Sequence, residues 1–157
     1  MTDHDWFAHG EGDISPQEIQ ERAAELEAIP DLIPDKEGLI EVPVLSLRDL
    51  IVFPHMTAPL SIGRRRTHLA IDEAHANHSI MLALPQRDPR KRNPLPQDYL
   101  SVGVEVAVSD IMNTADDQEA VLVQGRRRVE IIDFLTGGPV LYARGRVVEE
   151  TEKLNAE

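Results

Sequence analysis

The sequence predicts a mainly β protein with one or two helices, built as a small closed or half-closed barrel. About six stretches rich in Val, Leu and Ile have strand length. From residue 100 onward these stretches follow one another through short turns, which excludes a βαβ sheet because parallel strands need long crossovers. A single helical stretch interrupts the strands after residue 39. Many short strands with few helices are typical of barrels.

The composition suits one domain with an aliphatic core. The chain has 157 residues, of which 41% are hydrophobic and only 4% aromatic. There is no cysteine, which excludes disulfides, thiolate metal sites and a cysteine nucleophile. No apolar run is long enough to cross a bilayer, and the acidic N-terminus is unlike a signal peptide. We therefore expect a soluble, cytoplasmic protein with no membrane partner.

The charge divides the chain into an acidic N-terminal extension (1–38), a barrel domain (39–150) and a short tail (151–157). The extension carries 11 of the 28 acidic side chains and two of the 16 basic ones, so it holds −9 of the net −12. Its first 14 residues are polar and acidic and are expected to be disordered.

A helix is predicted over about residues 16–29. Ser15 is a suitable N-cap, Pro16 suits the first turn and Glu18 completes a capping box. An apolar stripe follows at helical spacing, formed by Ile19, Ala23, Leu26 and Ile29. Two alternatives are open: a peripheral helix laid on the domain, or a detached arm that pairs with another chain.

The first half of the barrel domain contains three expected strands and one helix. Residues 39–47 form a strand whose Pro43 places it at an edge or at a strand start. Residues 57–62 form a second strand, and residues 64–77 a helix introduced by Gly63. The compact apolar run 79–84 is expected to be a strand buried on both faces, and a proline-dense loop follows to residue 96.

The second half is expected to be entirely β. In residues 100–112 four valines alternate with smaller or polar residues, which is the clearest strand pattern in the chain. A polar turn leads into a long strand or strand pair over 120–134, with Gly125 at a bulge or sharp bend. The last strand covers residues 140–148, after a Gly137–Gly138 turn.

Motifs for catalysis are absent. No lysine follows a glycine, and neither G-x-G-x-x-G nor G-x-S-x-G occurs, so we expect no enzyme activity, no catalytic residue and no cofactor. His68, Asp72 and His75 share one face of the expected helix, which is a geometry that zinc ligands use. Partly buried or surface imidazoles are the favoured alternative, and no metal site is assigned.

Arginines cluster in the barrel domain. If the clusters converge, they form a basic patch that can hold an acidic peptide or a nucleic acid. The sequence pI of about 4.9 and the lack of interleaved aromatic residues argue against nucleic acid. The alternative is that these side chains are solvated and paired with local acids, including those of the N-terminal helix. The patch would comprise Arg64, Arg65, Arg66, Arg126, Arg127 and Arg128.

Four ordered stretches resemble the N-terminal substrate-recognition domain of the Lon family of ATP-dependent proteases. They are VPVLSLRDLIVFPHMTAPLSIGR (42–64), AIDEAHAN (70–77), PLPQDYLSVGVEVA (94–107) and VLVQGRRRV (121–129). The resemblance covers roughly residues 39–150 and implies a PUA-like pseudo-barrel. The ATPase and Ser-Lys protease modules of full Lon proteins are absent from this sequence. If the chain is a fragment, the resemblance implies that the parent protein is an ATP-dependent serine endopeptidase. The acidic helix and the two histidines, His68 and His75, depart from the family pattern.

The resemblance implies a non-catalytic module that binds unfolded or tagged protein substrates and aids self-association or assembly with Lon-type modules. An exposed apolar loop over residues 50–56 is the expected contact, since a short segment cannot bury all of its apolar side chains. The alternative is that this loop packs under the barrel. A second expected contact is a free strand edge near residues 39–45. A different function, a stand-alone PUA-like RNA-binding or regulatory domain, is the alternative. The polypeptide-binding residues are predicted to be Ile51, Val52, Phe53 and Met56.

Overall fold

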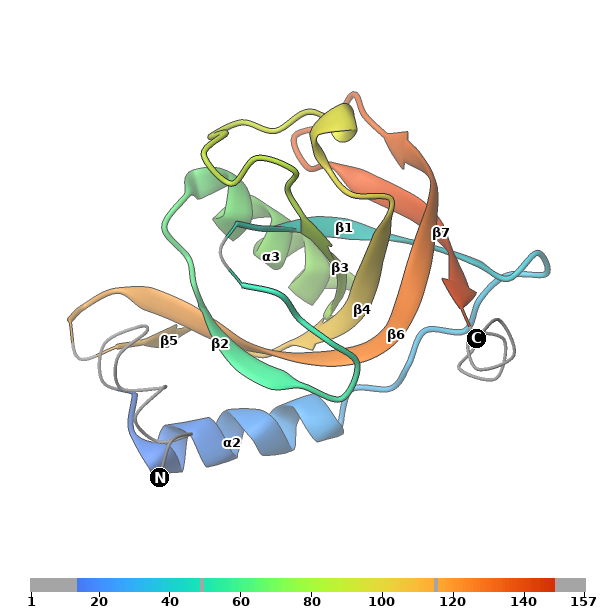
Figure 1. Cartoon of the computed structure of the whole chain (residues 1–157). Coiled ribbons are helices and arrows are strands. Elements are labelled where there is room, and N and C mark those ends of the chain that lie inside the picture. The colour runs from blue at the N-terminus through green and yellow to red at the C-terminus, as the bar shows by residue number, and fades with distance from the viewer. Residues whose placement is uncertain (1–13, 49, 115, 149–157) are drawn as a thin grey trace.

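The computed structural model describes residues 14–48, 50–114 and 116–148, and the predicted tail and almost all of the predicted disordered start lie outside them. The described chain forms one sheet of seven strands with two α-helices and a 3₁₀ turn (Figure 1). The elements are α2 (Pro16–Glu27), β1 (Leu39–Leu47), β2 (Thr57–Ser61), α3 (Arg65–Asn77), β3 (Ile80–Pro85), η1 (Pro96–Asp98), β4 (Val102–Val108), β5 (Met112–Asn113), β6 (Glu119–Leu135) and β7 (Tyr142–Val148).

Five strands close into a barrel. The hydrogen-bonded order is β2-β6-β4-β3-β1-β7, and an additional pairing of β6 with β7 closes the ring β6-β4-β3-β1-β7. The 17-residue β6 makes this possible, because its first part pairs with β2 and β5, its middle with β4 and its last part with β7. The predicted mainly β barrel with two helices is confirmed.

The core lies on both faces of the sheet. Along β3, Ile80 and Leu82 belong to one apolar cluster while Met81 and Ala83 belong to another, so the strand is buried on both sides as predicted. One of these clusters includes Ile71 and its neighbours on α3, and the other includes Leu26 of α2. Each helix therefore covers an apolar face that the sheet would otherwise leave in water.

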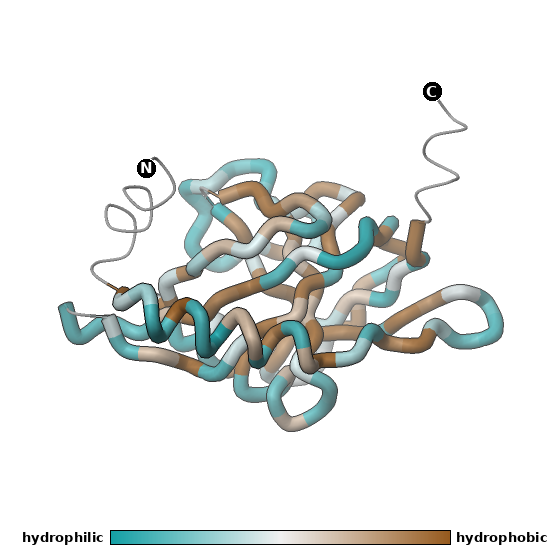
Figure 2. The backbone as a smooth tube through the Cα atoms, turned by 90° about the horizontal axis from the view of Figure 1, so that it is seen from below, coloured by the Kyte–Doolittle hydropathy of each residue, from teal (hydrophilic) through white to brown (hydrophobic). Residues whose placement is uncertain are grey.

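Helix α2 lies against the barrel, next to β6 (Figure 1). Its predicted cap is present, since the Ser15 hydroxyl accepts a hydrogen bond from the Glu18 amide at 3.1 Å. Leu26 is fully buried, and hydrophilic and hydrophobic residues alternate along the helix in Figure 2. The carboxylate of Glu25 also accepts a bond from the Asp110 amide. The alternative of a detached arm is therefore wrong.

The prediction of an edge strand at residues 39–47 is also wrong. Strand β1 is interior, pairing with β7 over Leu39–Pro43 and with β3 from Val44 onward. Val44 donates its amide to the Leu141 carbonyl on the β7 side, so the nitrogen of Pro43 points to the opposite side, where pairing has not yet begun. The missing donor therefore costs no ladder bond. The expected free edge near residues 39–45 is confined to the side of Leu39–Pro43 away from β7, because pairing with β3 begins at Val44. The strand at the margin of the sheet is β2, which contains Pro59.

Candidate functional site

The apolar loop before β2 divides its side chains between water and the core. Ile51 and Phe53 are 59% and 52% exposed, whereas Val52 between them is only 4% exposed. Met56 is half-buried. The alternative that the whole loop packs under the barrel is thus wrong, and so is the expectation of Val52 as a surface residue. Two large apolar side chains stand out from a segment that Val52 anchors.

The backbone of this loop is fixed by a turn and by β6. The Met56 amide bonds the Phe53 carbonyl at 3.1 Å across Pro54 and His55, and His55 has φ of +70°, as in a type II turn. Gly125 then exchanges two backbone bonds with the loop, donating to Met56 at 2.7 Å and accepting from His55 at 2.8 Å. A Cβ at Gly125 would lie 2.1 Å from the Phe53 carbonyl oxygen, so the approach requires glycine. Phe53 is therefore held in place and is presented outward.

The six arginines of the expected basic patch do not act as one group. Arg126 bonds the Leu26 and Ile29 carbonyls at 2.7 and 2.9 Å and pairs with Asp31, so it holds the end of α2. Arg127 bonds the Leu32 carbonyl and pairs with Glu105. Two of the predicted ligand-binding arginines thus attach the acidic extension to the barrel, as the alternative interpretation expected. Arg128 makes no side-chain hydrogen bond or ion pair with any residue that the structure describes.

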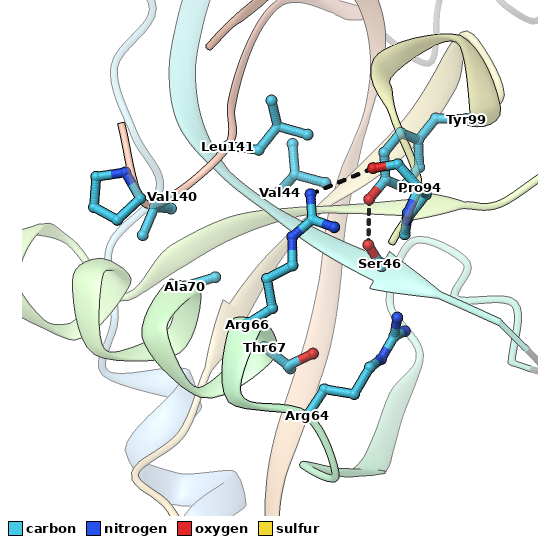
Figure 3. A pocket seen from close by; sticks show the side chains of 11 residues that line it. Val44, Ser46, Arg64, Arg66, Thr67, Ala70, Pro94, Tyr99, Val140 and Leu141 are labelled. Atoms are coloured by element: carbon cyan, nitrogen blue, oxygen red, sulfur yellow. Dashed lines mark hydrogen bonds between the residues drawn. The ribbon is translucent and has the colours of Figure 1, made fainter. Parts of the chain in front are cut away.

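The other three arginines gather at the beginning of α3. Arg64 and Arg66 line a small pocket with Ser46 and Tyr99, where the Arg66 guanidinium bonds the Pro94 carbonyl at 3.3 Å (Figure 3). The Tyr99 hydroxyl and the Ser46 hydroxyl are hydrogen-bonded. Burial raises the pKa of Tyr99, while the Ser46 bond and the neighbouring arginines oppose the shift. A wider, shallow pocket of about 580 Å³ adjoins it, lined by Arg48, Arg64, Arg65, Arg66, Leu69, Arg92 and Asn93.

The helix histidines do not converge on one point. The two nitrogens of His68 face Asp72 at 3.1 Å and Glu119 at 3.4 Å, whereas His75 bonds the Ser109 carbonyl at 2.8 Å. Across the described ranges, no group of three or more His, Cys, Asp or Glu side chains has a metal-binding arrangement. Neither described helix has the length and apolarity needed to span a membrane.

The sequence did not identify the roles of Arg48, which lines the pocket, and of Glu105, which lies in the core. Arg48 follows β1 directly and joins the α3 arginines only because the fold brings the end of β1 to that helix. Glu105 was placed on the polar side of an alternating strand, yet it is fully buried. The neighbouring Gly103 and Ala107 are small, which was the available signal that this side of β4 is also packed.

Comparison with known proteins relates the chain to Lon proteases. The model of the ATP-dependent protease La (LON) substrate-binding domain matches residues 41–157, which excludes α2. The Lon protease of Halothermothrix orenii is 30% identical over 117 residues, which are 74% of this chain and 15% of that protein. Lon protease 1 of Thermus thermophilus is 32% identical over 71% of this chain and 14% of its own length. The chain therefore matches only a small part of these curated relatives.

Solved structures agree with the sequence matches. The N-terminal domain of Mycobacterium avium complex Lon protease superposes with a TM-score of 0.59 and 31% identity, over 71% of this chain and 56% of that one. The Lon N-terminal domain protein from Xanthomonas campestris, at 18% identity, shares the fold with a TM-score of 0.51 over 69% of this chain and 59% of that one. With the family model matching most of the barrel, the chain belongs to the family of Lon protease substrate-binding domains.

Proposed function

We propose that this domain binds unfolded or tagged polypeptides and presents them to Lon-type ATPase and protease modules. The observation that carries the proposal is the outward pair Ile51 and Phe53, held on a fixed turn in a domain of the substrate-binding family. Folded proteins bury their large apolar side chains, so a solvent-exposed aliphatic and aromatic pair discriminates in favour of unfolded chains. The domain itself contributes binding only, and bond cleavage belongs to the other modules.

The loop's rigidity favours binding. Because Gly125 and the Phe53–Met56 turn fix the backbone, little conformational entropy is lost when a peptide covers the two side chains. The contact is nevertheless small, and burial of apolar area contributes only about 25 cal/mol per Å². One domain should therefore bind weakly, and linked copies should bind more tightly through avidity. Self-association of the domains, or their assembly with the other modules, would supply that linkage.

A crosslinking experiment tests the apolar pair. A permanently unfolded, uncharged, apolar-rich peptide with a photoreactive group is titrated against the whole chain and against Phe53→Asp. We expect Phe53→Asp to lower labelling about tenfold, because it replaces a buried apolar contact by a charge that must be desolvated. Ile132→Asp is the matched control, since Ile132 is 46% exposed on β6 and receives the same charge. Equal labelling of Phe53→Asp and the unaltered chain would contradict the site.

A further inference from the structure

The pocket at the beginning of α3 concentrates positive charge that no carboxylate of the described ranges pairs with. Glu119, which lines a neighbouring pocket with Arg64 and Arg65, faces His68 at 3.4 Å instead. Five of its seven lining residues are arginines, contributed by the end of β1, the first turn of α3 and the loop after β3. We call the side chains of Arg48, Arg64, Arg65, Arg66 and Arg92 the arginine pocket.

Their hydrogen bonds go to backbone carbonyls rather than to carboxylates. Arg48 bonds the Pro89 carbonyl at 2.7 Å, and Arg64 and Arg66 bond the carbonyls of Arg92 and Pro94. These bonds hold the loop after β3 against α3 and neutralise no charge. None of the carboxylates in the described ranges forms an ion pair with any of the five. By contrast, five other arginines each have a carboxylate partner: Arg22, Arg90, Arg126, Arg127 and Arg144.

The surroundings increase the unfavourable charge density. Helix α3 has no acidic residue in its first turn and no side-chain cap at Arg64, so the positive end of its dipole adds to the arginine charges. Burial, and then the nearby charges of Arg48 and Arg66, lower the pKa of Arg64. Such an arrangement is destabilising in the free protein, and a bound anion would relieve it.

The lining favours an acidic polypeptide over a nucleic acid. Leu69 is 38% exposed at the wall of the pocket, where it can contact the aliphatic part of a peptide. Among the described residues, no aromatic ring lines the arginine pocket as a stacking platform, and Tyr99 in the adjacent pocket is buried and bonded to Ser46. The net charge of −12 also opposes a long polyphosphate chain, whereas a short segment with two or three carboxylates brings less like charge to the protein and fits within a pocket of about 580 Å³. Guanidinium groups pair with carboxylates through two parallel bonds.

We infer that the arginine pocket binds acidic segments of the polypeptides that the domain recognises. This inference rests on the proposed function and adds a charge preference to it. The apolar loop and the arginine pocket are linked through Arg48, which lies just before the loop. A segment that combines Asp or Glu with apolar residues would engage both, and its affinity would fall with rising salt.

Two double variants with the same change in charge test the inference. The pocket variant combines Arg65→Gln with Arg92→Gln. Neither side chain forms a hydrogen bond with the described residues, so the fold should be retained. Arg87→Gln with Arg146→Gln is the matched control, because both arginines are exposed and lie outside the pocket. Binding of three labelled probes is measured by fluorescence anisotropy: a peptide rich in Asp and Leu, the same peptide with Asn for Asp, and a single-stranded RNA.

We expect the pocket variant to weaken binding of the acidic peptide about tenfold and the control to change it less than about twofold, since only the pocket variant removes direct contacts. The Asn peptide should bind both variants alike. Equal weakening by the two variants, or equal affinity of the Asp and Asn peptides for the unaltered chain, would overturn the inference. So would tighter binding of RNA that depends on Arg65 and Arg92.

The same assay separates this inference from the proposed function. One outcome is that Phe53→Asp abolishes binding of the Asn peptide, while the acidic peptide binds the unaltered chain no more tightly than the Asn peptide does. The apolar site then stands, and the arginine pocket fails as a peptide site. If no peptide binds at all, both fail. Sedimentation of each variant at low and high salt tests a second copy as the occupant. Self-association of the unaltered chain that high salt and the pocket variant both abolish would also overturn the inference.

Discussion

At the scale of single residues, Glu105 and Arg127 form an ion pair whose carboxylate lies in the core of the barrel. Glu105 is fully buried, and Arg127 meets its two oxygens with bonds of 2.6 and 2.9 Å. The hydrogen bond to Glu105, opposed by partial burial, raises the pKa of Arg127. A buried carboxylate without its cation is strongly unfavourable, whereas an apolar pair in the same place need not be.

We therefore predict that Arg127→Met lowers the free energy of unfolding by about 3 kcal/mol. The double variant with Glu105→Leu should recover most of this loss, because it also removes the isolated charge. Urea denaturation of the two single variants and the double variant measures the coupling. Additive losses would show that the two side chains stabilise the fold independently.

Tyr142 makes stability depend on pH in the alkaline range. Its hydroxyl donates to the Glu73 carboxylate, and burial together with this bond raises the pKa of the phenol from 10.0 to about 12. The folded protein thus holds the phenolic proton more tightly than the unfolded chain does. The contribution is complete below pH 10 and is lost as the pH rises towards 12.

The expected result is a steeper loss of stability between pH 10 and 12 in the unaltered chain than in Tyr142→Phe. Urea denaturation at several alkaline pH values compares the two proteins. Spectrophotometric titration of the variant should also lack one high-pH phenolate transition. Identical pH profiles would mean that Tyr142 ionises freely while the protein is folded.

At the scale of elements, α2 depends on Arg126 for its attachment. The guanidinium bonds the carbonyls of Leu26, in the last turn, and Ile29, just beyond it, and it pairs with Asp31 at 2.7 Å. Such charge-assisted bonds contribute about 1.5–3 kcal/mol each at most, so their loss should release the helix without unfolding the barrel.

Arg126→Gln should therefore raise amide hydrogen exchange in residues 16–27 about tenfold or more, while the amides of β3 and β4 keep their protection. Arg128→Gln is the control, because Arg128 lies on the same strand and has no side-chain bond within the described residues. Exchange is followed by mass spectrometry of peptic fragments. A similar change in both variants would assign the effect to the charge of β6 instead.

Elements governed by local chemistry were predicted well. Ser15 and Pro16 define the start of α2 through contacts within one turn, and the valines of β4 identify their strand by alternation. Pro43 led to the wrong prediction of an edge strand. Its missing amide donor is harmless because β1 changes its pairing partner there, from β7 to β3. The prediction that the side chains of the loop 50–56 cannot all point inward was correct. The outward placement of Phe53, however, depends on contacts with Gly125, which is far away in the sequence.

At the scale of the whole molecule, tertiary partners decide what a cluster of like charges does. Arg126 reaches carbonyls 97 and 100 residues earlier in the chain, so nothing near it in the sequence showed that it is engaged. Arg64 and Arg65 belong to the same kind of run, yet they lie beside Arg48 and Arg92 and form no ion pair with a carboxylate in the described chain. Glu119, which lines a neighbouring pocket with both, faces His68 instead. Of the six predicted arginines, Arg126 and Arg127 thus attach the acidic extension, and Arg64 to Arg66 line the candidate binding surface.

The closure of the ring by β7 also constrains how the protein is made. The strand β1, first in the barrel, pairs with β7, and β7 also seals β6. A ribosome synthesises β1 long before its permanent neighbour exists, so the nascent chain carries an open flank that other chains can join. Because the sealing contacts join segments far apart in sequence, folding to the finished state waits for translation and is slow. The nascent chain is therefore most open to aggregation before β7 emerges.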